Sequence, residues 1–557
     1  MPHRLTTDEP VPAAEAKLAR SRGIDPMNAG HAVLAVIAGY GVDTVFGIPG
    51  THNLEFYRHV GRLGIRPITT RHEQGAGYAA EAWARRTGLP GVVITTSGPG
   101  LLNVLSAAGT AFCESRPMIV LAPGAPRGEE FNDSGVLHET KGQLAAAEAV
   151  FAQATRATSA QEAVDAVHGA FALFRTGRPR PVYIEMPLDV LQSRADLATG
   201  SLEPRPAPGP TPADADAVDE AARLLSAAQR PLIVAGGGSL AAGDTLRELA
   251  ERLGAPIATT LNGKGVVPES HPHSLGAEMR LRNVQELAED ADVLLVVGAK
   301  IGRQELWGHS ISPRGAVIRI DVLASQLDKN LPATVGLVGH AERVTEQLRD
   351  ALATLVTEPR APHLDLAKLR TSLVRVSADF APVEDRLAAR IVRMLPEGSI
   401  VTGDASQVSY FGMAYRFAPE RPSAFLSTPT YATLGYGLPA AIGAKVASPE
   451  ATVVSVLGDG ALMFALQEFQ TAVEQGLDLT VVCVDNGGYK EIRENEAARG
   501  IAPVAVDLAQ PDWAALMDAF GGRGLRVPRA EDLEAVLAEA ISAPGVNLVH
   551  VPLGLFV

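Results

Sequence analysis

The stretch VVSVLGDGALM, residues 453–463, does most to decide the fold. Five residues suited to a buried strand run directly into Gly458-Asp459-Gly460, and the helical pattern ALMFALQEFQTAVEQG follows. In parallel α/β sheets, ligands bind beyond the carboxyl ends of the strands, and the amides at a helix start favour phosphate. A carboxylate there would repel phosphate unless a hard cation such as Mg²⁺ lay between them. Asp459 is therefore predicted to be a metal ligand.

A second set of oxygen atoms is expected from the neighbouring strand. The run LTVVCV (479–484) ends in DNGGY (485–489), and Asn486 lies 27 positions after Asp459. An amide oxygen and a backbone carbonyl are both ligands that Mg²⁺ accepts. We therefore expect the Asn486 side chain and the Gly488 carbonyl to complete the metal site.

Composition excludes several classes of partner and site. The 557 residues carry a formal net charge of −14, with 46% hydrophobic and 20% charged residues, which is typical of a soluble globular protein. The negative charge argues against nucleic acid or an anionic membrane surface as the partner. Two cysteines, Cys113 and Cys483, provide neither a disulfide framework nor a zinc cluster, so a cytoplasmic location is expected.

Two proline-rich stretches divide the chain. SLEPRPAPGPTPADAD (201–216) and the shorter TEPRAPH (357–363) favour extended linkers. The polar N-terminus lacks the apolar core of a signal peptide, and no apolar run approaches the roughly 20 residues that span a bilayer. The predicted organisation is a mobile leader followed by three domain-sized segments: 1–26, 27–200, 213–356 and 364–557.

Each segment alternates short β-branched runs with helical patterns, which predicts an α/β fold of three doubly wound domains with parallel sheets. The outer two segments also resemble each other internally. GVVITTSGPG (91–100) and TVVSVLGDG (452–460) are each followed by a helix and then a further strand. Two related domains flanking a third are the expected arrangement.

The metal elements resemble a known motif. Gly-Asp-Gly followed after about 25–30 residues by Asn-Asn is similar to the thiamine diphosphate motif, although the first Asn is Asp485 here. The resemblance implies Mg²⁺ bound by Asp459, Asn486 and the Gly488 carbonyl, so the departure spares the ligands. Asp485 is expected to act in loop packing.

The wider chain resembles the acetolactate synthase and pyruvate decarboxylase superfamily. In the first segment the matching elements are VFGIPG (45–50), RHEQGAGYAAEAWAR (71–85) and TSGPGLLN (96–103). The resemblance implies pyrimidine-binding, middle and diphosphate-binding domains, with thiamine diphosphate as cofactor. Glu73 matches the family's catalytic glutamate, which activates the aminopyrimidine. Taken alone, a glutamate at a helix start is also common for electrostatic reasons.

The last segment resembles the diphosphate-binding domain of the same family. TPTYATLGYGLPAAIGAK (428–445) places Leu434 where a bulky residue bends the cofactor, although an ordinary core leucine is an alternative. Ser406 has the alternative of a helix N-cap. The residues implied to contact the cofactor are Asp404, Ser406, Gln407, Leu434, Gly458, Gly460, Ala461 and Tyr489.

In this family the two outer domains meet across a subunit boundary. Glu73 of one chain would then serve cofactor held by Asp459 of another. The resemblance therefore implies a homodimer at least, with a homotetramer as a common form, and active sites at the subunit interface.

Two histidines are candidates for proton transfer. His52 lies in GIPGTHN and His138 in GVLHETKGQ, and a side chain that titrates near neutrality suits acid–base work. We predict a catalytic role for both. A hydrogen-bonded loop histidine is the alternative for each.

The stretch 485–513 is expected to cover the active site. LHETKGQ, GGYKEIR and RGIAPVAVDL resemble the 5-guanidino-2-oxopentanoate decarboxylases. Glu491, Ile492 and Glu494 are therefore substrate-contact candidates, because a carboxylate can hold a guanidinium through paired hydrogen bonds. A solvated helix face is the alternative.

The resemblance predicts non-oxidative decarboxylation of a small 2-oxo acid, with a guanidino side chain as one substrate hypothesis. Acetolactate synthase, or another carboligase or lyase, is the alternative, and a catalytically silent relative is disfavoured by retention of the key residues. VAGGGS (234–239) raises a nucleotide-binding dehydrogenase, but no GxGxxG opens a helix there. LGAEMRLRN (275–283) lacks the pattern of FAD-binding synthases, so FAD is considered but not favoured.

Overall fold

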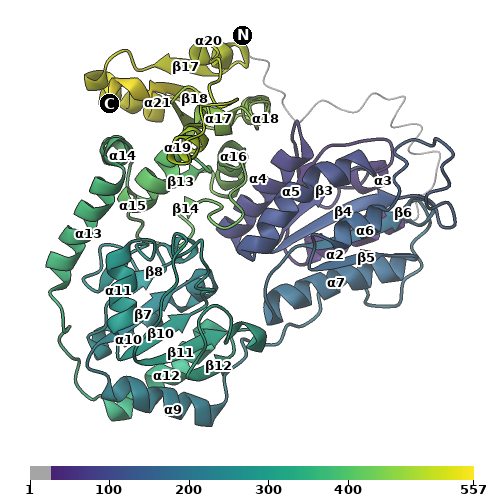
Figure 1. The fold of residues 1–557 in the computed structure, drawn as a ribbon. Helices are drawn as coiled ribbons and strands as arrows, with labels where there is room; N and C mark the ends of the chain where they lie inside the picture. The colour runs from purple at the N-terminus through teal and green to yellow at the C-terminus, as the bar shows by residue number, and fades with distance from the viewer. Residues whose placement is uncertain (1–26) are drawn as a thin grey trace.

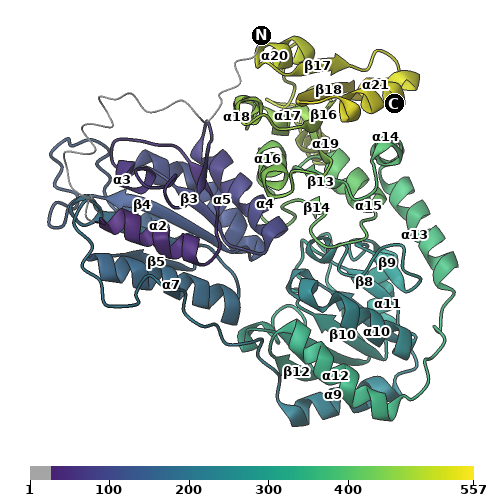
Figure 2. The same cartoon turned by 180° about the vertical axis from the view of Figure 1, so that it is seen from behind.

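The computed structural model describes residues 27–557, and the predicted leader, 1–26, lies outside this range. Three lobes, each built on one six-stranded sheet, form a triangle (Figures 1 and 2). All strand pairs in the three sheets are parallel, and helices cover the sheet faces. The α/β prediction of three parallel, doubly wound domains is confirmed.

The first sheet has the order β2-β1-β3-β4-β6-β5. Its strands are β1 (Thr44–Gly47), β2 (Arg66–Thr69), β3 (Gly91–Ile94), β4 (Met118–Gly124), β5 (Gln153–Arg156) and β6 (Val182–Pro187). Its helices are α2 (Ala29–Gly39), α3 (Leu54–Tyr57), α4 (Glu73–Thr87), α5 (Pro99–Glu114), α6 (Gln143–Glu148), α7 (Ala160–Thr176) and α8 (Leu188–Leu191).

The third sheet repeats this topology in the order β14-β13-β15-β16-β18-β17. Its strands are β13 (Ile400–Gly403), β14 (Phe425–Leu426), β15 (Val453–Gly458), β16 (Leu479–Asp485), β17 (Arg523–Arg526) and β18 (Val546–Pro552). The accompanying helices are α13 (Leu366–Phe380), α14 (Pro382–Met394), α15 (Ala414–Arg416), α16 (Gly437–Ala447), α17 (Asp459–Leu462), α18 (Glu468–Glu474), α19 (Lys490–Ala498), α20 (Trp513–Ala519) and α21 (Leu533–Ser542). The predicted internal resemblance of the outer segments is thus present as one strand order used twice.

The middle sheet has a different order, β12-β11-β10-β7-β8-β9. Its strands are β7 (Pro231–Ala235), β8 (Ile257–Thr259), β9 (Ser274–Gly276), β10 (Val293–Val297), β11 (Ala316–Asp321) and β12 (Val335–Val338), with helices α9 (Ala215–Ala227), α10 (Gly243–Leu253), α11 (Arg282–Asp290) and α12 (Ala341–Leu355). The chain runs outward in both directions from β7 and β10, so their carboxyl ends form a topological switch point, where α/β sheets bind ligands.

One predicted element differs. The pattern over 461–476 predicts a single helix, but α17 ends after one turn and α18 begins only at Glu468. The Glu468 carboxylate is fully buried and accepts hydrogen bonds from the backbone amides of Arg71 and His72. The break therefore accompanies a contact with the first domain that a continuous helical pattern does not reveal.

The two outer domains share one core in the chain. Helices α4 and α16 pack side by side at the centre of the molecule (Figures 1 and 2), and their cluster of buried side chains continues into both sheets. Gly443 permits the approach, because a Cβ there would lie 2.0 Å from the Ala79 carbonyl oxygen. Tyr436 donates a buried hydrogen bond of 2.5 Å to Glu81 across the same contact.

Among the described residues, no helix is both long enough and apolar enough to cross a membrane.

Replacing Gly443 with alanine is expected to separate α4 from α16 and to lower the free energy of unfolding by about 1–3 kcal/mol. The matched control is Gly169→Ala in α7, where a Cβ meets nothing within 4 Å and where alanine should stabilise the helix by roughly 0.5–1 kcal/mol. Urea unfolding followed by circular dichroism measures both. Equal midpoints for Gly443→Ala and wild type would contradict the proposed close packing.

Candidate active site

Asp459 and Asn486 lie at the carboxyl ends of neighbouring strands. Parallel pairing of β15 with β16 sets Gly458 opposite Val484, so the residues that follow each strand meet at one edge of the sheet. The backbone amide of Asn486 donates to Asp459 Oδ1 at 3.2 Å. The sequence-predicted ligand pair is therefore brought together by strand register alone.

The remaining oxygens of this pair lack partners. Asp459 Oδ2 and Asn486 Oδ1 are both buried and accept no hydrogen bond from a described residue. Burial raises the pKa of Asp459, although backbone amides including that of Asn486 oppose the shift. A Cβ at Gly460 would lie 3.3 Å from the Gly488 carbonyl oxygen, which places that carbonyl beside the same loop. Three oxygens of these types fit a small divalent cation such as Mg²⁺.

Asp485, the residue that departs from the motif, forms hydrogen bonds within its own domain. Asp485 Oδ2 accepts from His550 Nε2 at 2.9 Å, and Oδ1 accepts from the Gly487 amide at 2.9 Å. These hydrogen bonds hold the pKa of Asp485 below its usual range despite partial burial. Both oxygens of Asp485 therefore hold the loop in place.

A cavity of about 440 Å³ opens beside these oxygens. Every residue that the sequence assigned to the cofactor or the metal lines it, as do Glu491 and Ile492, whereas Glu494 does not. The assigned residues are Asp404, Ser406, Gln407, Leu434, Gly458, Asp459, Gly460, Ala461, Asn486, Gly488 and Tyr489. Four residues of the middle domain also line it, namely Leu261, Arg280, Gln304 and Trp307, and no lining residue comes from the described part of the first domain.

Asp404 fixes the turn that leads into α16. Its carboxylate accepts from the amides of Ala405, Gly435 and Gly437 at 2.9, 3.2 and 2.7 Å. Burial raises its pKa to about 6, although these amides oppose the shift. The same turn presents Leu434 to the cavity.

Glu73 is the first residue of α4 and lies apart from this cavity in the same chain. Its side chain is 7% exposed and accepts from Asn103 Nδ2 at 2.9 Å. The His72 side chain caps the helix by accepting from the Gln74 amide at 3.1 Å. Within one chain, Glu73 therefore lies outside the cavity that Asp459 and Asn486 line.

Sequence reasoning missed Glu468, which connects the start of α4 to the last domain. Its carboxylate accepts from the amides of Arg71 at 3.2 Å and His72 at 3.0 Å, and from Thr471 Oγ1 at 2.7 Å. Glu468 thereby holds the residues just before Glu73 against the domain that carries Asp459. The only available signal was a glutamate within an otherwise apolar helical pattern.

His52 and His138 lie together in a second cavity, of about 430 Å³, in the first domain. Ser97 Oγ lies 2.6 Å from His52 Nδ1 and 3.3 Å from His138 Nδ1, so the hydroxyl bridges the two rings. Burial and the neighbouring His138 lower the pKa of His52. Ser97 was not predicted, because nothing in TTSGPG distinguishes it from a loop serine.

Three family models match consecutive parts of the chain. They are described as the N-terminal TPP binding domain, the central domain and the C-terminal TPP binding domain of thiamine pyrophosphate enzymes, and they match residues 27–148, 218–348 and 404–551. The "Probable 2-ketoarginine decarboxylase AruI" of Pseudomonas aeruginosa is 36% identical over 527 residues, 94% of each chain. The protein belongs to the thiamine pyrophosphate enzymes.

Further relatives of this thiamine pyrophosphate enzyme carry another name. The "Probable acetolactate synthase large subunit" of Methanocaldococcus jannaschii is 31% identical over 544 residues, 92% of this chain and 90% of the relative. The "Acetolactate synthase isozyme 2 large subunit" of Escherichia coli K12 is 30% identical over 538 residues, 94% of this chain and 95% of the relative. The predicted superfamily and enzyme class are confirmed.

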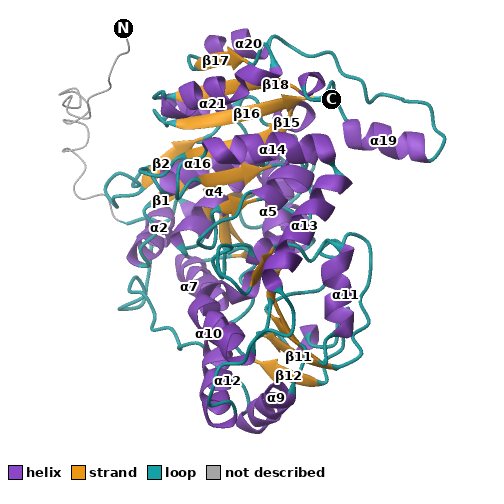
Figure 3. Ribbon diagram, turned by 90° about the vertical axis from the view of Figure 1, so that its left-hand side faces the viewer, coloured by secondary structure: helices purple, strands orange, loops and turns teal. Residues whose placement is uncertain are grey.

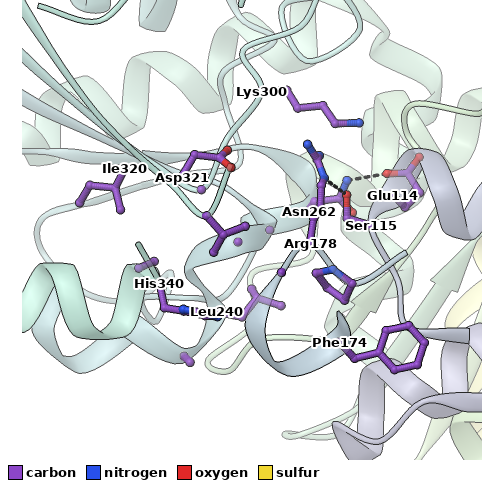
Figure 4. A pocket seen from close by; sticks show the side chains of 18 of the residues that line it. Glu114, Ser115, Phe174, Arg178, Leu240, Asn262, Lys300, Ile320, Asp321 and His340 are labelled. Carbon is purple, nitrogen blue, oxygen red and sulfur yellow. Dashed lines mark hydrogen bonds between the residues drawn. The ribbon is translucent and has the colours of Figure 1, made fainter. Parts of the chain in front are cut away.

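A third cavity, of about 280 Å³, lies at the switch point of this enzyme's middle domain (Figure 4). Glycines that follow β7 and β10 line it, together with Arg178, Lys300 and Asp321. Asn262 Nδ2 donates to Glu114 at 2.6 Å at its edge. The stretch 275–283, on which FAD was considered from the sequence, does not line this cavity, and the expectation that FAD is absent stays a prediction.

Asp459→Ala is expected to weaken Mg²⁺-dependent binding of thiamine diphosphate by more than about a hundredfold, since it removes the charged ligand. Isothermal calorimetry with and without Mg²⁺ measures the change. The control is Glu220→Gln, which removes an exposed carboxylate and should bind like wild type. Unchanged cofactor binding in Asp459→Ala would contradict the metal assignment.

Proposed function

We propose that this protein is a thiamine diphosphate- and Mg²⁺-dependent decarboxylase of a 2-oxo acid with a guanidino side chain. The observation that carries the proposal is an acidic pair at the mouth of the cofactor cavity. Glu491 Oε2 accepts from Gln407 Nε2 at 2.9 Å and from the Tyr410 hydroxyl at 3.0 Å, and Glu494 accepts from the same Gln407 nitrogen at 2.5 Å.

The pair is placed to meet a substrate arriving from solvent. Helix α19, which carries both glutamates, has no buried residue and extends from the body of its domain (Figure 3). Glu491 lines the cavity, and Ile492 beside it is 51% exposed. Hydrogen bonds from Gln407 and Tyr410 hold Glu491 in one orientation, as recognition of a planar guanidinium requires. The relative from Pseudomonas aeruginosa named for 2-ketoarginine supports the same substrate class.

The proposed roles of the remaining residues follow from their positions. Asp459, Asn486 and the Gly488 carbonyl would hold Mg²⁺ and, through it, the diphosphate. When bound, thiamine diphosphate supplies the carbon nucleophile and the electron sink for loss of CO₂. Glu73 would hold the proton that activates the cofactor, and His52 and His138, bridged by Ser97, would move protons to and from the product.

The assembly is proposed to be a homodimer or homotetramer in the cytoplasm. No described residue of 27–200 lines the cofactor cavity, and Glu73 lies elsewhere in the same chain, so the site is incomplete without a second copy. Cys113 and Cys483 are both free thiols, which suits a reducing compartment.

Acetolactate synthase is the second candidate. The two relatives with that name described above are about as long as this chain and are 30–31% identical to it. A synthase that joins two 2-oxo acids with uncharged side chains would give Glu491 no cationic substrate group to bind, so the decarboxylase is preferred.

Glu73→Gln is expected to lower the rate of CO₂ release at least about a hundredfold while thiamine diphosphate still binds, because an amide cannot hold the activating proton. Stopped-flow CO₂ assays and calorimetry measure the two effects. The exposed Glu220 provides a matched control as Glu220→Gln, which should behave like wild type. Turnover near the wild-type rate in Glu73→Gln would remove its catalytic role.

A panel of 2-oxo acids tests the substrate assignment. The panel contains the 2-oxo acid of arginine, pyruvate, 2-oxobutanoate, and a 2-oxo acid whose uncharged side chain is as long as that of arginine. Release of CO₂ is measured for each, and mass spectrometry identifies the product. The guanidino acid should be turned over with the highest kcat/KM and should give an aldehyde. Formation of acetolactate from pyruvate, with the guanidino acid inert, would favour the synthase instead.

A further inference from the structure

An unpaired arginine lines the cofactor cavity. Arg280, just before α11, is 9% exposed, yet its guanidinium makes no hydrogen bond or ion pair with any residue in the described range 27–557. Its Nη1 atom is fully buried without a partner, and its guanidinium carbon lies 4.7 Å from the centre of the Trp307 ring. Glu114 and Glu305 attract it only from beyond ion-pair distance.

A buried arginine without a partner destabilises the folded protein unless an anion binds to it. Burial lowers the pKa of Arg280, but an arginine side chain remains charged in proteins. A buried charge without a partner is strongly destabilising, and the contact with Trp307 satisfies none of its N–H donors. The cavity therefore presents donors in a fixed fork that matches a carboxylate or a phosphate.

The neighbours of Arg280 separate these two anions. The metal ligands, where the diphosphate is proposed to bind, come from the loops after β15 and β16. Arg280 instead lies with Trp307, whose ring centre is 5.9 Å from that of Tyr410, and the Tyr410 hydroxyl donates to Glu491. Arg280 thus lies at the end of the cavity that carries the acidic pair.

We propose that Arg280 binds the carboxylate of the 2-oxo acid, while the acidic pair at the same end of the cavity receives its cationic end. This inference rests on the proposed function for the cationic end alone. The unpaired Arg280 and the Glu491 carboxylate at one end of a cavity complement a zwitterion, and a guanidino 2-oxo acid is one. The arrangement also orients the substrate, since reversing it would set like charges together.

The carboxylate leaves as CO₂, which has consequences for the kinetics. An interaction with that group is present in the bound substrate and is lost as the C–C bond breaks. Arg280 should therefore contribute to capture of substrate and act mainly on KM, with a smaller effect on kcat.

Three inert probes separate the two ends of the site. Pentanoate carries the carboxylate alone, butylguanidinium the cation alone, and 5-guanidinopentanoate both. Calorimetry is done on the enzyme loaded with Mg²⁺ and thiamine diphosphate. Arg280→Gln should weaken the binding of pentanoate and of 5-guanidinopentanoate by at least about tenfold, and should leave the binding of butylguanidinium unchanged. The matched variant Glu491→Gln should weaken both guanidinium probes and leave pentanoate unaffected.

Controls distinguish the remaining explanations. Arg280→Lys keeps the charge without the fork and should restore part of the lost affinity, which a purely structural role would not predict. Arg280→Gln should also raise KM for every 2-oxo acid that is turned over by a larger factor than it lowers kcat. Should Arg280→Gln leave pentanoate binding unchanged, or lower thiamine diphosphate affinity instead, the inference is wrong and Arg280 serves the cofactor or the fold.

The outcome is independent of the substrate panel. If the guanidino acid is inert but other 2-oxo acids are decarboxylated, the proposed function fails. Loss of pentanoate binding in Arg280→Gln would then still support the carboxylate role of Arg280, whereas unchanged pentanoate binding would reject it.

Discussion

Two buried oxygens, Asp459 Oδ2 and Asn486 Oδ1, are the constraint around which the site is organised, since neither has a hydrogen-bond partner within residues 27–557. They meet because β15 and β16 are adjacent parallel strands that end at the same edge, so the sheet determines their separation. Leaving two such acceptors buried is costly unless a cation joins them. The surrounding glycines, the turn held by Asp404 and the loop held by Asp485 all serve to keep this one edge open to a ligand.

Electrostatics divide the cavity into two regions. At one end lie the acceptor oxygens of Asp459 and Asn486, which are proposed to bind a metal ion. At the other, Arg280 and the Glu491–Glu494 pair present opposite charges within reach of Tyr410. The middle domain supplies Arg280 and Trp307 to a cavity otherwise built by the last domain, so it does more than space the outer domains apart. The proposed selectivity for a substrate would thereby be assembled from segments far apart in the sequence.

Local signals account for what could be predicted. Strands were recognisable because β-branched runs buried on both faces end in glycine turns, and the metal site because Gly-Asp-Gly and Asn486 each follow such a run. Contacts between distant segments carry no such signal. Glu468 accepts from an amide 396 positions away, and Arg280 resembles any other loop arginine until the fold places it in a cavity. The break between α17 and α18 was missed for the same reason, since it accompanies a contact with another domain.

The Glu468 contact has a consequence for how paired sites behave. Within one chain, Glu468, in the segment that begins with Asp459, accepts hydrogen bonds from the two residues that precede Glu73. In the proposed dimer, that Glu73 would serve the cofactor of the neighbouring chain. Binding of a metal ion at one site would then restrict the motion of the Glu73 that serves the other site. The two active sites would be coupled through the buried Glu468 carboxylate. In such an enzyme, cofactor binding at one site would depend on cofactor binding at the other.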